Sequence, residues 1–346
     1  MKRRSFLKAT AASAAAALAP WSRAAGASEE AELYAAAKGE GQVTWYTAHF
    51  DTQTAESIGN AFAAKYPGVR ANVVRTTAQV AFQRLSQDLK TGIAECDVFS
   101  STDLGHYVRL KPMGVFLEYA APNAARLLPQ FKNIDPDGEY FVTSAGLICI
   151  TYNKDKVKES EAPKNWPDLL DPKWKNQISV GHPGFSGYVG TWVVEMRNLY
   201  GWEYFEKLQA NEPQIGRSIN DTVTMLNSGE RSVAAGPEAT TLESAARGNP
   251  LGVIYPTDGA LLMVSPSAVM KNSRRINAAK LFMDFLMSPD ASEILVRNFS
   301  PAVVPGVGPA PGAKPLAEVK TIRPSAEEIT AGIPEVIKRW RDTFGA

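Results

Sequence analysis

FVTSAGLICITYNKD, residues 141–155, is the stretch that decides the fold. Within it, every residue from Gly146 to Thr151 is apolar, small or β-branched, and the polar segment YNK at 152–154 ends the run. A run this short, with β-branched members, predicts a strand buried on both faces rather than a helix. It lies near the middle of the chain, between two segments in which strands and helices alternate. We therefore interpret it as a crossover between two lobes that face a common cleft.

The composition is that of an ordinary globular protein. The 346 residues are 45% hydrophobic and 21% charged, which is enough core-forming material for one large domain or two lobes. The cysteines, Cys96 and Cys149, lie in or beside predicted core strands, and we interpret them as small buried hydrophobes. No basic patch or long charge run indicates a nucleic-acid partner. We expect a monomer with no cofactor.

Residues 1–27 have the features of an export signal. A basic start leads into an Ala-rich apolar run that ends in small residues at Ala24, Ala25 and Ala27. Arg3-Arg4 followed by SFLK fits the twin-arginine pattern, and the alternative is an ordinary Sec signal that contains two arginines. The apolar run is far shorter than the roughly 20 residues that span a bilayer. We expect export to the periplasm and a mature net charge of about −4, since five of the 37 basic residues leave and 32 face 36 acidic ones.

Strands and helices alternate on both sides of the central strand. Before it, strands are predicted at 42–46, 69–75 and 97–100, and helices at 55–62, 80–89 and 103–113. After it, strands are predicted at 178–181 and 232–235, and helices at 186–199, 202–208, 222–226 and 238–246. This alternation predicts βαβ units and largely parallel sheets. Strands at 253–255 and 261–269 then lead back, and helices at 278–286 and 325–340 complete the chain.

These elements predict three segments after the signal peptide. We place the first lobe at 28–142 and the second lobe at 143–256. The remainder, 257–346, returns to the first lobe and carries the C-terminal helices.

Four loops at the expected carboxyl ends of strands are rich in hydroxyls and small residues. Ligands of open parallel sheets bind at that end, where loops and helix N-termini meet. A single Ser or Thr there can be no more than an N-cap, but four such loops from two lobes predict a polar binding site. The candidate ligand-binding residues are His49, Phe50, Thr76, Thr77, Ser101, Thr102, Phe185, Ser186, Gly187 and Tyr188.

The segment GFSGY at 184–188 is the strongest of these elements. Its glycines allow close backbone approach, and the helix that begins there presents free N–H groups that suit a phosphate, phosphonate or carboxylate. No Gly-Lys-Ser/Thr follows, so it is not a nucleotide-binding P-loop. No nucleophile elbow, HExxH motif or Ser/Lys pair predicts catalysis.

Three acidic residues complete the candidate set: Asp221, Glu238 and Asp258. Each lies near a predicted strand end or loop, where a solvated surface carboxylate is the default. If two of them face the cleft, they would suit an amine or a metal. His49 and His182 are too far apart in sequence to indicate a metal site.

Several motifs, taken in order, resemble a known family. They are VTWY at 43–46, DVFS at 97–100, TYNK at 151–154, WPDLLDPKW at 166–174, PTDG at 256–259 and NAAKLFMDFLMS at 277–288. With the export signal, they resemble family 1 extracellular solute-binding proteins of ABC importers, in the branch that includes ferric-ion binders. The resemblance covers nearly the whole mature chain. It implies an α/β protein with the two-lobed type II periplasmic-binding fold, a hinge of crossover strands, one small-molecule ligand and an ABC permease as partner.

The resemblance implies less about the ligand. Ferric binders of this branch hold iron with a Tyr-Tyr pair in a second-lobe loop, whereas that loop reads AGPEAT at 235–240 here. Ser101 and Thr102 stand where an acidic ligand is expected, and His49 lies close to the position of a histidine ligand in some members. Other members resemble binders of phosphonates, sugar phosphates, thiamine or polyamines.

We expect a phosphorylated, phosphonate or carboxylate solute, which can be zwitterionic. The hydroxyl-rich loops and the helix start at 184–188 favour an anion, and the acidic trio allows an amine on the same molecule. The alternatives are a ferric binder with a non-tyrosine ligand set, a polyamine or thiamine binder, a sensory binding protein, and an exported enzyme on the same scaffold.

Overall fold

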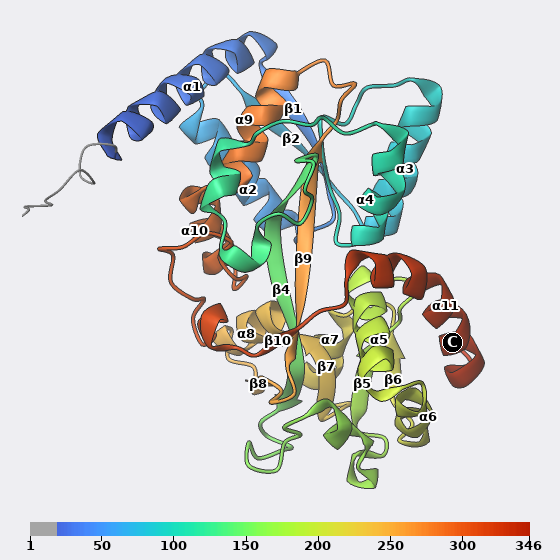
Figure 1. The fold of residues 1–346 in the computed structure, drawn as a ribbon. Helices are drawn as coiled ribbons and strands as arrows, with labels where there is room; N and C mark the ends of the chain where they lie inside the picture. The colour runs from blue at the N-terminus through green and yellow to red at the C-terminus, as the bar shows by residue number, and fades with distance from the viewer. Residues whose placement is uncertain (1–18) are drawn as a thin grey trace, which may run out of the picture.

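Two α/β lobes are joined by two long strands, β4 (Tyr140–Asn153) and β9 (Ala260–Val269), in the computed structural model (Figure 1). The structure describes residues 19–346, with side chains from residue 29 onward. Every residue of β4 except Phe141 is buried, which confirms the predicted doubly covered crossover strand. β4 is longer than the apolar run at 146–151, because it continues through both lobes and ends in the polar YN pair. The predicted signal peptide, residues 1–27, lies outside the residues whose side chains are described.

The strands form one sheet that runs through both lobes. Its order is β2-β1-β3-β9-β4-β7-β5-β6, with β10 paired to β9 and β8 paired to β4. Within each lobe the outer strands are parallel, as the βαβ alternation predicts, whereas β4 and β9 pair antiparallel to each other and to their neighbours β3 and β7. The remaining strands are β1 (Gln42–Thr47), β2 (Arg70–Arg75), β3 (Val98–Ser100), β5 (Ile178–Gly181), β6 (Gln214–Gly216), β7 (Val233–Pro237), β8 (Leu251–Ile254) and β10 (Thr321–Ile322).

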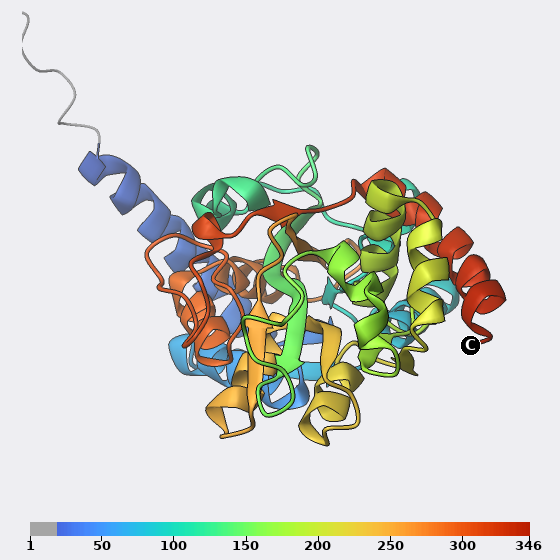
Figure 2. The ribbon, with the colours of Figure 1, turned by 90° about the horizontal axis from the view of Figure 1, so that it is seen from below.

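Helices cover the sheet on both faces (Figures 1 and 2). Those of the first lobe are α1 (Ala19–Glu40), α2 (Thr52–Lys65), α3 (Ala78–Thr91), α4 (Leu104–Leu110), α9 (Ile276–Leu286) and α10 (Pro289–Arg297). Those of the second lobe are α5 (Gly187–Tyr200), α6 (Glu203–Ala210), α7 (Asp221–Asn227) and α8 (Glu238–Ala246), and α11 (Ala326–Phe344) follows last. The sequence patterns predicted most of these helices but not α10, and they did not predict the short strands β6 and β10.

Each lobe has its own hydrophobic core, and β4 contributes to both. Leu147 and Cys149 belong to the first-lobe core, whereas Ile148 and Ile150 belong to the second. This division follows from strand geometry, because successive side chains point to opposite faces of a sheet. The two lobes are therefore mechanically linked through a strand whose alternate residues are held by different cores. The lobe boundaries at 142/143 and 256/257 stay a prediction.

The C-terminal helix α11 packs across both lobes rather than on one. It contacts α4 of the first lobe and α5 of the second, and it lies along the outside of α5 (Figure 2). Ile329 is buried in a first-lobe cluster, whereas Val336 and Trp340 are buried in the second-lobe core. Pro334 lies inside the helix between these two anchoring regions. No helix in the described part of the chain is long and apolar enough to cross a membrane.

Candidate functional site

A cavity of about 620 Å³ lies between the lobes. That volume is in the range of small-molecule sites in proteins. Its walls come from both lobes and from the hinge strand β4, and the loops involved all follow the carboxyl ends of strands. Residues of all four loops predicted from sequence are brought together here. The first lobe supplies residues 48–54, 75, 77–79 and 102, β4 supplies 144–147, and the second lobe supplies 185–188, 218–220, 237, 239–240, 243 and 247.

Helix N-termini converge on this cavity. Two of them are closed by a side chain: Asp51 accepts from the Thr54 amide of α2 at 2.7 Å, and Ser186 accepts from the Val189 amide of α5 at 3.4 Å. The N-caps of α3 and α8, Thr77 and Pro237, make no such side-chain bond. The first turn of a helix carries free N–H groups and the positive end of the dipole. One uncapped terminus from each lobe therefore opens on the same space.

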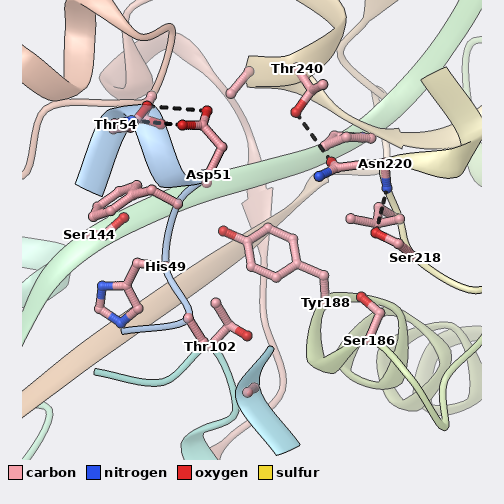
Figure 3. A pocket seen from close by; sticks show the side chains of 18 of the residues that line it. His49, Asp51, Thr54, Thr102, Ser144, Ser186, Tyr188, Ser218, Asn220 and Thr240 are labelled. Carbon is pink, nitrogen blue, oxygen red and sulfur yellow. Dashed lines mark hydrogen bonds between the residues drawn. The ribbon is translucent and has the colours of Figure 1, made fainter. Parts of the chain in front are cut away.

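Hydroxyl groups line the remaining polar wall. Figure 3 shows Tyr188 projecting between Thr102 of the first lobe and Ser186 of the second. Burial raises the pKa of Tyr188 to about 12, so its phenol stays neutral and can donate a hydrogen bond. Ser144, on β4, is only 2% exposed and also lines the cavity. The polar wall of the cavity therefore includes hydroxyls from both lobes and from β4.

Two glycines permit this close arrangement. A Cβ atom at Gly187 would lie 3.3 Å from the Thr102 carbonyl oxygen, so the start of α5 already touches the first lobe. A Cβ atom at Gly146 would lie 2.7 Å from the Tyr188 hydroxyl oxygen, so a larger residue in β4 would displace that ring. Both positions depend on the small size of glycine rather than on an unusual φ.

His49 ties the first-lobe loop to the hinge. Its Nε2 lies 3.0 Å from the carbonyl oxygen of Pro266 in β9 and 3.3 Å from that of Ser101. Because carbonyl oxygens only accept, Nε2 carries the proton. Burial lowers the pKa of His49 to about 4, so the ring is neutral at ordinary pH. His49 therefore adds no positive charge to the cavity and fixes the loop position instead.

The charged residues at the cavity walls balance one another. Arg75 donates to the Phe50 carbonyl oxygen at 2.5 Å, and Arg247 pairs with Glu243 at 2.5 Å on the exposed side. With Asp51, these make two positive and two negative side chains. The walls therefore carry no excess of positive side chains, and their other polar groups are helix termini and hydroxyls. Across residues 29–346, no three His, Cys, Asp or Glu side chains are grouped as metal ligands.

Eight of the ten loop residues proposed from sequence line the cavity, and Thr76 and Ser101 do not. Ser101 is buried, and its hydroxyl is bonded to His106 Nδ1 at 2.8 Å. The Thr76 amide donates to the Thr47 carbonyl oxygen, which continues the β1–β2 ladder by one residue. The following residue, Thr77, is the one that faces the cavity.

None of the three acidic candidates lines this cavity. Asp221 accepts from the Ser218 amide at 3.0 Å and stabilises the turn before α7. Asp258 accepts from the Trp166 amide at 3.0 Å and from the Tyr200 hydroxyl at 2.6 Å, inside the second lobe. Glu238 is buried and points to a different cavity, described below.

Sequence reasoning missed part of the second-lobe wall. Ser218 and Asn220 follow β6, which has only three residues and carries too short a pattern to identify. Asn220 Oδ1 accepts from the Thr240 hydroxyl at 3.2 Å, which joins two of the missed residues. Ser144 was also missed; it lies two residues before the apolar run 146–151, and a hydroxyl in a strand predicted to be buried was an available signal.

Two lobes, crossover strands and a polar cavity between them define the type II periplasmic-binding class of proteins. The chain belongs to the family described as bacterial extracellular solute-binding protein, whose sequence model matches residues 96–320.

Individual relatives are distant. A putative 2-aminoethylphosphonate-binding periplasmic protein from Salmonella paratyphi A is 22% identical over 87% of this chain and 88% of its own length. The periplasmic binding protein AfuA from Actinobacillus pleuropneumoniae, solved with fructose-6-phosphate, has a TM-score of 0.77 at 22% identity, over 88% of this chain and 98% of its own. Iron-bound HitA from Pseudomonas aeruginosa has a TM-score of 0.75 at 20% identity, over 87% of this chain and 99% of its own. At such identities these structures support the fold alone.

Proposed function

We propose that this chain is the solute-binding component of an ABC importer and that it captures a small anionic or zwitterionic solute. The ligand class is a phosphonate, a phosphorylated compound or a carboxylate. The observation that supports this proposal most directly is the pair of uncapped helix termini, α3 and α8, that open on one cavity from opposite lobes. In this proposal the protein is an exported periplasmic monomer, sent through the twin-arginine route, and it delivers its ligand to a membrane permease.

The mechanism is binding and closure. An acidic group at the cavity receives N–H donors from α3 and α8 and hydroxyl donors such as Thr77 and Tyr188. Because these donors belong to different lobes, the ligand contacts both lobes only when they are close together. A ligand with more contacts in one state shifts the population to that state. The strands β4 and β9 carry the motion, and the closed form is the one presented to the permease.

A ligand panel identifies the solute class. The mature protein, unfolded and refolded to remove bound solute, is screened by thermal shift with 2-aminoethylphosphonate, phosphate, fructose-6-phosphate, small carboxylates, thiamine, putrescine and ferric citrate. A ligand at 100 times its Kd adds about 2.7 kcal/mol of stability, which is a large shift. Stabilisation by phosphonates or phosphates supports the proposal. Stabilisation by putrescine, thiamine or ferric citrate alone contradicts it.

Thr77→Asp is expected to weaken binding of the stabilising anion from this panel by about tenfold to a hundredfold. An Asp N-cap accepts the free N–H groups of α3 and places a negative charge where the ligand's acidic group binds. Loss of a charge-assisted hydrogen bond costs about 1.5–3 kcal/mol, which corresponds to this range. The same substitution leaves the free energy of unfolding unchanged or raises it, because Asp is a good N-cap. Calorimetric titration and urea unfolding measure the two effects.

The matched control is Thr91→Asp, at the other end of α3. It makes the same change in charge on the same helix but lies outside the cavity. We expect unchanged affinity and slightly lower stability, because a negative charge is unfavourable at a helix C-terminus. Equal affinity in both variants would remove the α3 terminus from the binding site.

A further inference from the structure

A second cavity of about 430 Å³ lies beside the cleft. It is formed where the Pro- and Gly-rich segment 299–317 covers the start of α8 and residues 128–130. Its walls are mostly apolar, with side chains such as Leu128, Val304 and Leu316. The charged side chains that reach it are Glu238 and Lys314.

This second cavity is distinct from the cleft although the two share a wall. Leu147 of β4 lines both. At the start of α8, Pro237 and Ala239 line the cleft, whereas Glu238 between them lines the second cavity. The same alternation occurs after α10, where Asn298 and Ser300 line the cleft and residue 299 lines the second cavity. Glu238 therefore lines the second cavity and not the cleft.

Glu238 is a buried carboxylate without a counter-ion. It is 2% exposed, and its one hydrogen-bond partner among the described residues is the Tyr255 hydroxyl, which donates to Oε1. No basic side chain of the described chain forms an ion pair with it. Removing a charge from water costs several kcal/mol unless a partner compensates. When Glu238 is ionised, its charge therefore has no positive partner among the described side chains.

The other titratable groups nearby do not supply that charge. Cys149 and Tyr255 face Glu238, and burial raises the pKa of both, so they are neutral. Lys314 is exposed, and its ammonium lies over the Tyr255 ring, 5.1 Å from the ring centroid. Its charge is thus solvated at the rim of the second cavity. Inside, the wall combines apolar surface with a single negative group.

We propose that the second cavity binds an organic cation that carries an ammonium group on an apolar body. The ammonium pairs with Glu238, and the apolar body contacts the segment 299–317. Such a ligand satisfies both properties of the wall, because it compensates the buried charge and removes apolar surface from water. This site is independent of the anion cleft.

The test uses hexan-1-amine as the probe and hexan-1-ol as its neutral analogue, in calorimetric titrations of the mature protein near pH 8. The amine is expected to bind about tenfold or more tightly than the alcohol, because a charge-assisted hydrogen bond is worth about 1.5–3 kcal/mol. Burial raises the pKa of Glu238 to about 7. Affinity for the amine should therefore fall about tenfold from pH 8 to pH 6, where Glu238 must first lose a proton. An alkyl ammonium stays charged over this range.

Two glutamate variants of α8 decide where the amine binds. Glu238→Gln keeps the shape and the acceptor for Tyr255 but removes the charge, and we expect the preference for amine over alcohol to disappear. Glu243→Gln removes a carboxylate of the same helix that faces the cleft, and we expect no change. Equal binding of amine and alcohol, or a larger loss in Glu243→Gln than in Glu238→Gln, overturns the proposal. The Thr77→Asp variant should bind the amine normally, so failure of the cleft proposal does not affect this test.

Discussion

Trp340→Ala is expected to lower the free energy of unfolding by about 3–5 kcal/mol, the usual cost of truncating a large buried aromatic residue. The side chain is fully buried in the second-lobe core. Its ring stacks on Phe344 with centroids 4.2 Å apart and meets Phe205 edge-on at 5.7 Å. The indole N–H has no hydrogen-bond partner among the described residues, so the loss is one of packing.

Urea unfolding of the mature protein measures this effect. The control is Phe185→Ala, which removes an aromatic ring that is 52% exposed, and we expect a change within about 0.5 kcal/mol. A loss below about 1 kcal/mol in Trp340→Ala would mean that α11 contributes little to the second-lobe core, contrary to the packing described.

Glu238→Gln is expected to stabilise the protein by about 3 kcal/mol near pH 8 and by little near pH 4.5. Burial raises the pKa of Glu238 from 4.5 to about 7, so between these values the folded state holds a proton that the unfolded state releases. Stability therefore falls as the pH rises through this window and stays low above it. Glutamine carries no charge, so the Glu238→Gln variant does not lose stability as the pH rises through this window. Urea unfolding at several pH values measures the difference in free energy of unfolding between the variant and the wild type. The control is Glu230→Gln, at an exposed position, which should leave the free energy of unfolding unchanged at each pH.

His49 has the opposite effect on stability. Its pKa is lowered from 6.5 to about 4, so the unfolded state takes up a proton first and stability is lost as the pH falls from 6.5 to 4. Over pH 4.5–6.5 the effects of Glu238 and His49 on the free energy of unfolding have opposite signs. Their sum should therefore change little with pH in the wild type. In the Glu238→Gln variant, the free energy of unfolding should fall as the pH is lowered from 6.5 to 4, because the effect of His49 is no longer offset. A Glu238→Gln profile parallel to that of the wild type would contradict this account.

The sequence predicted the fold well because the deciding signals are local. A strand buried on both faces, such as β4, has a continuous apolar run, and the βα units end in Gly, Pro and capping residues. α10 was missed although Ser288 and Pro289 are typical of a helix start. The four cleft loops could also be located, because the topology brings the carboxyl ends of parallel strands together.

The direction in which a charged side chain points could not be predicted in the same way. Glu238 lies between two residues that face the cleft, yet its carboxylate faces another cavity. At a strand-to-helix junction, neighbouring residues point to opposite sides, so a shift of one residue decides which cavity a side chain faces. Asp258 shows a second cause, because it accepts a hydrogen bond from the backbone amide of Trp166, 92 residues away in sequence. Long-range contacts of this kind leave no local pattern.

The bridging position of α11 has a consequence for observing the protein in motion. The start of the described chain, α1, packs on α9 in the first lobe, whereas α11 ends beside the second-lobe core. Pro334, which lacks the N–H that would bond within the helix, lies between the two anchoring regions of α11. A fluorescent donor near Lys38 and an acceptor after Phe344 therefore report on different lobes. If the lobes close on a solute as proposed, energy transfer between the two dyes would record each closure event in a single molecule.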